Sequence, residues 1–141
     1  MNVSTLFKAI RNPLAALIVL RMLLTGQYYR FLFRLRRQRV LIGKNFRVRG
    51  PFDVQGPGLV IFGDDCTVIG SRLCPVTPFT HSASAVLVFG NRVVLNGTRF
   101  GCQQRIDVGE GSLLADARIM DTDFHDLAPQ NRPRWSTTGT A

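Results

Sequence analysis

The residues best suited to chemistry lie near the C-terminal end of the chain, in the stretch IMDTDFHDL at residues 119–127. Asp121 and Asp123 are two positions apart, and His125 follows two positions after Asp123. An imidazole has an unperturbed pKa of about 6.5, so it can act as a general base near neutral pH, as a metal ligand, or as a polar group on a turn. The elements that position these side chains decide which role applies.

Metal binding is the least favoured of these roles. The chain has two histidines, His81 and His125, and three cysteines without a CxxC spacing. A structural or catalytic zinc site needs several Cys or His residues at ligand spacing, which this sequence lacks. We therefore expect no metal, and free thiols at Cys66, Cys74 and Cys102.

Positive charge is concentrated in the first third of the chain. Residues 1–52 hold eleven Lys and Arg and no acid, whereas residues 53–141 hold seven Lys and Arg and all nine acids. The formal net charge of +9 is therefore +11 on the first segment and −2 on the second. This asymmetry predicts a basic arm on a nearly neutral domain, and such arms usually contact phosphate groups of nucleic acid or lipid.

The arm, residues 1–39, has the spacing of an amphipathic helix. Pro13 suits the first turn of a helix, and Gly26 is expected to kink or break it. The longest apolar run covers residues 14–20 and is too short for a membrane span, which needs about 20 residues. One apolar stripe recurs every three, four or seven residues: Ile10, Leu14, Leu17, Leu24, Tyr28, Phe31 and Leu35.

Three partners fit this helix. A basic, aromatic-rich helix without acids is typical of an anionic membrane surface, with the apolar face among the acyl chains. It can instead pack on its own domain or on a partner subunit. Nucleic acid is the weakest alternative, because the aromatic residues share the stripe with Leu and Ile instead of alternating with the cations Arg30, Arg34 and Arg37. We favour the membrane surface and expect no nucleic-acid partner.

From residue 40 to residue 127 the sequence repeats with an approximate period of six. An apolar residue opens nearly every unit and Gly often follows, as in IGKNFR, FGDDCT, FGNRVV and VGEGSL. Such short units predict a parallel β-helix with three strands in each triangular coil. A β-sandwich with Gly-rich turns is the alternative. The repeat breaks at residues 71–85, where we expect a loop, and we expect the Pro-, Ser- and Thr-rich residues 128–141 to be a loop or tail.

The two blocks IGKNFRVRGPFDVQGPGLVIFGDDCTVIG and FGNRVVLNGTRFGCQQRIDVGEGSLLADARIMDTDFHDL resemble the hexapeptide-repeat acyltransferases. The most similar branch contains the sugar O-acetyltransferases of polysaccharide and lipopolysaccharide biosynthesis. The resemblance implies an all-β fold, a left-handed parallel β-helix, preceded here by the basic helix. It also implies a homotrimer that uses acetyl-CoA or another acyl-CoA, in the cytoplasm at the inner face of the cell membrane.

The resemblance implies that His125 is the general base, which takes a proton from an acceptor hydroxyl during attack on the thioester. Asp121 and Asp123 alternate along the chain, so both can face the same side as His125. We assign them to orienting the imidazole or to holding hydroxyls of a sugar or lipid-linked glycan. Asn96 and Gln103 lie one coil earlier and are expected in the same cleft.

Four further polar residues have open roles. His81 is expected on the loop, although it can also reach the acceptor. Arg99, Arg105 and Arg118 occupy positions where the repeat prefers small residues. Their side chains either point outward at the edges of the coils or contact an anionic substrate.

The family continues beyond this histidine with further coils that carry the acyl-donor groove, and we expect this chain to lack them. On that basis little turnover is expected from the 141 residues alone. The alternative function is a non-catalytic, membrane-attached β-solenoid that acts as an interaction module.

Overall fold

The structure is a computed structural model that describes residues 12–122. Its first element is a single helix, α2 (Pro13–Leu35). The Asn12 side chain accepts a hydrogen bond from the Ala15 amide at 3.1 Å, and Pro13 occupies the first turn, where a missing N–H has no cost. The predicted N-terminal helix is therefore present, with its start at the predicted proline.

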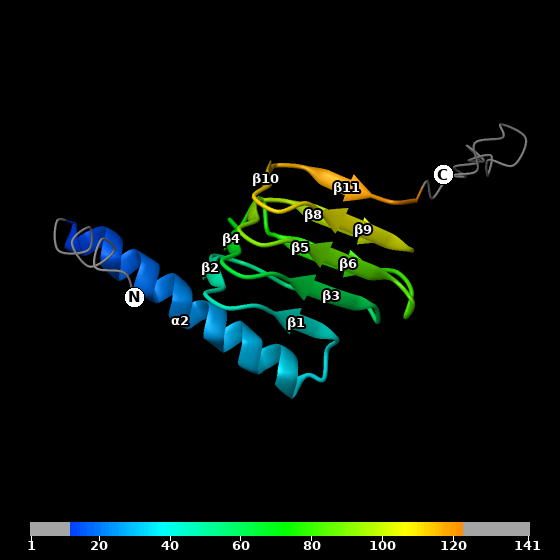
Figure 1. The fold of residues 1–141 in the computed structure, drawn as a ribbon, viewed down its shortest axis with the longest axis horizontal. Coiled ribbons are helices and arrows are strands. Elements are labelled where there is room, and N and C mark those ends of the chain that lie inside the picture. The colour runs from blue at the N-terminus through cyan, green and yellow to red at the C-terminus, as the bar shows by residue number, and fades with distance from the viewer. Residues whose placement is uncertain (1–11, 123–141) are drawn as a thin grey trace, which may run out of the picture.

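The rest of the described chain is a parallel β-solenoid of about four turns, as Figure 1 shows. Its strands form three sheets, in each of which every neighbouring pair is parallel. The first sheet contains β1 (Val40–Ile42), β3 (Leu59–Phe62), β6 (Val86–Phe89) and β9 (Arg105–Val108). The second contains β2 (Arg47–Arg49), β4 (Thr67–Ile69), β7 (Val94–Asn96) and β10 (Leu113–Ala115). The third contains β5 (Thr77–Thr80), β8 (Arg99–Cys102) and β11 (Arg118–Met120).

Successive coils differ in length, as the pairing in the first sheet shows. Val40 pairs with Val60, Val60 with Leu87, and Leu87 with Ile106, which gives spacings of 20, 27 and 19 residues. Each spacing exceeds three hexads, so extra residues are accommodated at the corners. The parallel solenoid was predicted correctly, and the β-sandwich alternative is wrong.

The corners between the first and second sheets explain the recurring Gly. Asn45, Asp65, Arg92 and Gly111 each adopt a positive φ there, a conformation that Asn, Asp and Gly tolerate best. A Cβ on Gly63, two residues before Asp65, would lie 2.7 Å from the backbone carbon of Gly90 in the next coil. Glycine is therefore required where the corners of neighbouring coils stack.

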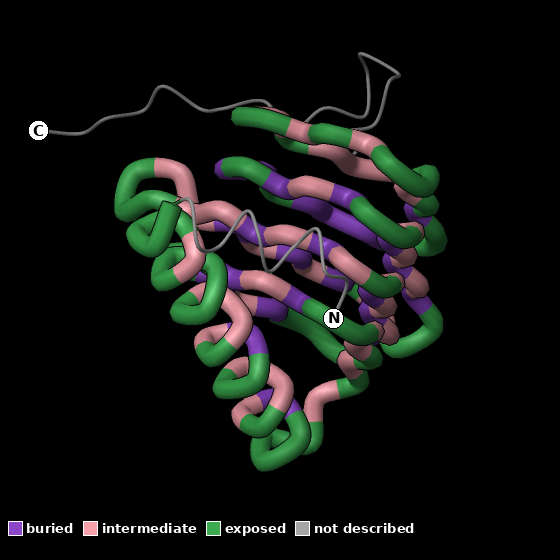
Figure 2. The backbone as a smooth tube through the Cα atoms, turned by 60° about the vertical axis from the view of Figure 1, so that its left-hand side comes forward, coloured by how far each residue is buried: buried purple, intermediate pink, exposed green. Residues whose placement is uncertain are grey.

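The interior is apolar and rich in aromatic rings. Figure 2 shows buried residues along the strands and exposed residues at corners and along much of α2. The rings of Phe62 and Phe89 stack with centroids 4.7 Å apart, and Phe89 contacts Phe100 at 5.0 Å. Cys66 and Cys102 are buried and Cys74 is partly buried, and none of the three forms a disulfide. The prediction of free thiols is confirmed.

Helix α2 covers the first coil by packing against β2 and β1. Phe33 is buried, and its ring lies 5.6 Å from that of Phe52. We expected Gly26 to kink or break the helix, and the break is wrong, because α2 continues through Gly26. Gly26 is instead a contact point: a Cβ there would lie 2.0 Å from the Phe46 carbonyl oxygen.

The predicted loop at residues 71–85 is also corrected. Strand β5 lies inside this range and belongs to the third sheet. The remaining residues form two shorter loops, one before β5 and one after it. The sequence of β5, TPFT, lacks the usual apolar alternation, but Pro78 and Thr80 point inward. The buried Thr80 hydroxyl accepts a hydrogen bond from the Gly58 amide at 2.8 Å, which allows a polar residue in the core.

Candidate functional site

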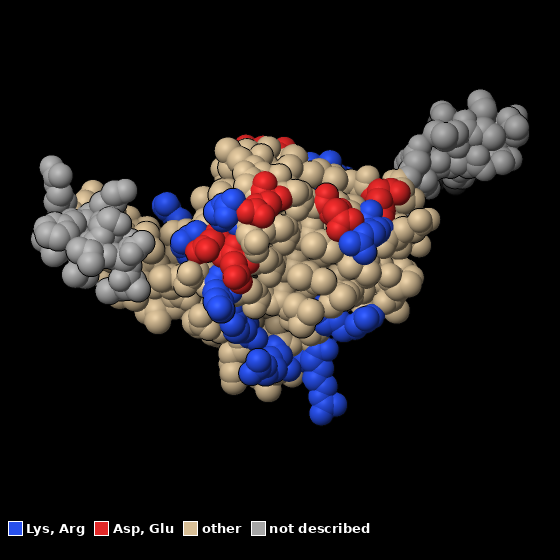
Figure 3. Space-filling model, viewed as in Figure 1, with Lys and Arg blue, Asp and Glu red and all other residues tan. Residues whose placement is uncertain are grey.

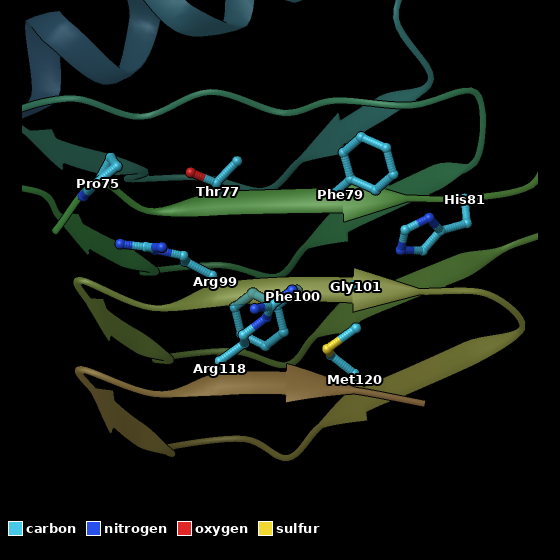
Figure 4. Close-up of a pocket in the computed structure, with 9 residues that line it drawn as sticks. All are labelled: Pro75, Thr77, Phe79, His81, Arg99, Phe100, Gly101, Arg118 and Met120. Carbon is cyan, nitrogen blue, oxygen red and sulfur yellow. The ribbon is translucent and has the colours of Figure 1, made fainter. Parts of the chain in front are cut away.

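The outer face of the third sheet contains a hollow of about 510 Å³. We call it the third-sheet hollow, and Figure 4 shows its lining. Nine residues form it: Pro75, Thr77, Phe79, His81, Arg99, Phe100, Gly101, Arg118 and Met120. A volume of this size is within the range of small-ligand sites.

Two arginines are brought together on this face by strand register. Arg118 on β11 pairs with Arg99 on β8, and Arg99 pairs in turn with Thr77 on β5. Both arginines are exposed, and neither makes an ion pair or side-chain hydrogen bond with another residue in the 12–122 range. The sequence analysis left their role open, and the structure places both guanidinium groups along one hollow.

The neighbouring row of the sheet is apolar. Phe79, Gly101 and Met120 are in register across β5, β8 and β11. The His81 ring lies against Phe79, with ring centroids 4.5 Å apart. A Cβ on Gly101 would be 3.2 Å from His81 Nε2 and 3.3 Å from Met120 Cε, so glycine keeps the floor of the hollow open.

Asp121 directly follows β11, and its side chain contacts the backbone of a turn in the preceding coil. Its carboxylate accepts hydrogen bonds from the backbone amides of Gln103 at 2.6 Å and of Gln104 and Arg105 at 2.7 Å. The Cys102 thiol donates to the same carboxylate at 3.6 Å. In this arrangement Asp121 stabilises the turn between β8 and β9, and its assignment to substrate or imidazole stays a prediction.

The electrostatics of this corner follow from those contacts. Partial burial raises the Asp121 pKa, but the hydrogen bonds from Gln103, Gln104, Arg105 and Cys102 outweigh burial and lower it below its ordinary value. Burial, followed by the nearby Asp121 charge, raises the pKa of the Cys102 thiol to about 11. Asp121 is therefore ionised at neutral pH, and Cys102 is a poor nucleophile there.

The other predicted site residues are not gathered in one cleft within the described part of the chain. Asn96 ends β7, and Gln103 follows β8, so the whole of β8 separates them. Both are exposed, and neither lines the third-sheet hollow. Asp123 and His125 lie outside the described residues.

Two further predictions concern metal binding and Arg105. Between residues 12 and 122, no three His, Cys, Asp or Glu side chains are placed to share a metal ion. Arg105, the third arginine singled out from the repeat, lies on β9 in the first sheet. It pairs with Asp107 at 2.6 Å on the surface and does not line the hollow.

Sequence reasoning missed Phe79, Gly101 and Met120. A signal was present: Phe79 and His81, Arg99 and Gly101, and Arg118 and Met120 are pairs at alternate positions, which face one side of a strand. Aligning these pairs requires the coil spacing, which is 22 residues from Thr77 to Arg99 and 19 from Arg99 to Arg118. The first of these spacings could not be read from the sequence, because residues 71–85 do not follow the six-residue repeat.

A second exposed surface, the α2 apolar face, runs along the side of the helix away from the solenoid. Every described member of the predicted stripe is among its exposed large apolar residues. The face consists of Leu14, Leu17, Leu20, Leu24, Tyr28, Phe31 and Leu35. Ile18 and Val19 are also exposed, but their helical positions lie toward the solenoid, where Ile18 lines a pocket with Val48. Packing on its own domain therefore uses another side of the helix and leaves this face uncovered by residues 12–122.

Exposed cations accompany the α2 apolar face. Arg21 and Arg34 lie on α2, and Arg36 and Arg37 follow its last residue. We call these four the α2 arginines, and all four are exposed. Arg30 differs, because it is half-buried and donates a hydrogen bond to the Gly43 carbonyl. Figure 3 shows cations and no carboxylates at the lower edge of the molecule, where α2 ends in Figure 1.

In the part of the chain that the structure describes, no helix is both long enough and apolar enough to cross a bilayer.

Comparison with known proteins adds no assignment: no protein-family model, curated protein or solved structure matches the chain.

Proposed function

We propose that this chain is an acyltransferase of the hexapeptide-repeat kind, which moves an acyl group, most simply acetyl, from acyl-CoA to a sugar hydroxyl. One observation carries the proposal. A parallel β-solenoid of about four turns ends its described part at β11, and the stretch DTDFH begins directly after that strand. The proposal includes a left-handed sense of the coils, a homotrimer, and a role in surface-polysaccharide or lipopolysaccharide biosynthesis.

In this mechanism His125 is the base. Its neutral imidazole takes the proton of the acceptor hydroxyl as the oxygen attacks the thioester carbonyl, and the imidazolium then protonates the departing thiolate. His125 comes five positions after Met120, and a chain of that length spans at most about 17 Å. The acceptor would therefore lie near the third-sheet hollow. Asp123 is proposed to orient the imidazole or hold the sugar.

The α2 apolar face supports a location at the inner surface of the cell membrane. The seven exposed apolar residues of this face, the four exposed α2 arginines and the absence of any acid from residues 13–37 match a helix that lies in the plane of an anionic bilayer. A membrane-bound enzyme would meet lipid-linked glycan acceptors directly. The same surface also favours the second candidate, a non-catalytic solenoid module attached to the membrane.

The test of the enzyme is thiol release from acetyl-CoA with nucleotide-sugar or lipid-linked saccharide acceptors at pH 7.5. It is run on the 141-residue chain and on the same chain extended with coils of a hexapeptide-repeat acyltransferase, because the resemblance places the donor groove there. His125→Ala should lower turnover by about 10²–10⁴-fold and leave the circular dichroism spectrum unchanged.

His81→Ala is the matched comparison, since His81 is the other histidine of the chain. If His125→Ala keeps full activity and His81→Ala loses activity, His81 and not His125 is the general base. If a folded, extended parent releases no thiol with any acceptor, the non-catalytic module describes the protein better.

A further inference from the structure

We propose that the third-sheet hollow binds a phosphate ester, with the phosphate groups held by Arg99 and Arg118 and an organic group against Phe79. The site goes beyond the acyltransferase proposal, because it would bind such a ligand whether or not His125 transfers an acyl group. The evidence is the register of β5, β8 and β11, which places the positive charges of Arg99 and Arg118 next to each other.

The two arginines are the first part of the argument. They occupy directly paired positions on β8 and β11, where neighbouring strands are about 4.8 Å apart. Like charges at paired positions repel each other. Some other arginines of the solenoid have partners: Arg47 donates to the Thr67 hydroxyl at 3.0 Å, and Arg92 pairs with Glu110 at 2.5 Å. Arg49 and Arg72 are exposed like Arg99 and Arg118, but they do not line the hollow. A bound anion would give Arg99 and Arg118 the counter-charge that residues 12–122 do not supply.

The chemistry of guanidinium favours phosphate over other anions. Each planar group can donate two parallel hydrogen bonds to oxygens of a phosphate, and two adjacent groups match a dianion or a diphosphate better than a single carboxylate. Thr77 lies in the same row and adds a hydroxyl that can donate to a phosphate oxygen.

The apolar part of the hollow indicates that the ligand carries more than phosphate. Phe79 and Met120 lie in the next row, with Gly101 between them, and together they leave space for a ring or a chain. His81 contacts Phe79 and adds a polar group at this end. A nucleotide, a sugar phosphate and a lipid-linked diphosphate all have this combination of phosphate and organic group.

The experiment measures binding to the full chain by calorimetry at low ionic strength, with inorganic phosphate, uridine diphosphate and farnesyl diphosphate as probes. Both diphosphate esters should bind more tightly than inorganic phosphate. Tighter binding of uridine diphosphate would identify a soluble nucleotide as the source, and tighter binding of farnesyl diphosphate a lipid-linked one. Esters that bind no better than inorganic phosphate would overturn the site, since this shows only general attraction to a basic protein.

The matched variants separate this site from overall charge. Arg99→Gln with Arg118→Gln should weaken binding of the preferred ester by about ten- to a hundred-fold. Arg49→Gln with Arg72→Gln removes the same charge from exposed positions outside the hollow and should change binding by less than about two-fold. Equal losses in the two double variants, or no loss in the first, would overturn the proposal. All four side chains are exposed, so both variants should fold like the parent.

Discussion

Replacing Gly26 with alanine tests how α2 is held on the solenoid. In the middle of an exposed helix this change is stabilising by about 1 kcal/mol, because alanine has the higher helix propensity. Here the sign should reverse. The new Cβ would lie 2.0 Å from the Phe46 oxygen and 2.9 Å from the Phe46 carbonyl carbon, far inside the 3.5–4.0 Å at which nonbonded atoms attract.

The size of the effect follows from what must move. Phe46 O is a backbone atom of the first coil, so the helix must shift outward to accept the methyl group. That shift loosens the rings of Tyr29 and Phe33, which now lie 5.2 Å and 5.6 Å from the ring of Phe52. Overpacking of this kind costs about 1–3 kcal/mol. A 2.0 Å approach to a backbone atom favours the upper part of this range, so the cost exceeds the propensity gain of about 1 kcal/mol.

Urea unfolding followed by circular dichroism measures this free energy, and hydrogen exchange at residues 29–33 reports local release of the helix. Gly26→Ala should unfold at lower urea and exchange faster. Gln27→Ala, at the exposed neighbouring position, should stay within about 0.5 kcal/mol of the parent. If Gly26→Ala is instead stabilised by about 1 kcal/mol, α2 does not pack on Phe46, and the orientation of the α2 apolar face is wrong.

Three further predictions concern the membrane surface, the core and the corner at Asp121. Changing the α2 arginines to Gln should weaken binding to anionic vesicles by about 1 kcal/mol for each charge, most at low salt, in a sedimentation assay; equal binding of parent and variant to anionic and neutral vesicles would refute the membrane surface. Leu87→Asp should unfold the solenoid because Leu87 is fully buried, whereas Leu113→Asp, at a position 71% exposed, should melt like the parent by circular dichroism. Asp121→Asn should cost about 1–3 kcal/mol at pH 7 through the backbone donors it leaves poorly paired. Because the folded pKa of Asp121 is lowered from about 3.9, this stabilisation is present above pH ~4 and is lost as pH falls through the folded value, so parent and variant should converge in acid unfolding curves.

The sequence by itself determined the elements that depend on neighbouring residues. Pro13 and the stripe spacing predicted the helix, and every described member of the stripe is exposed together on one face. Short apolar units followed by glycine predicted a parallel solenoid, because a strand and its corner are encoded within six or seven residues.

The tertiary structure decided what depends on residues about 20 positions apart. Gly26 reads locally as a helix breaker, but contact with Phe46 gives it a packing role. Asp121 reads as part of a catalytic cluster, but its carboxylate meets the backbone of residues 103–105 in the preceding coil. The row of Arg99 and Arg118 likewise exists only once coils of unequal length are in register. The physical reason is that side chains on one solenoid face are neighbours across coils, so coil length sets which of them meet.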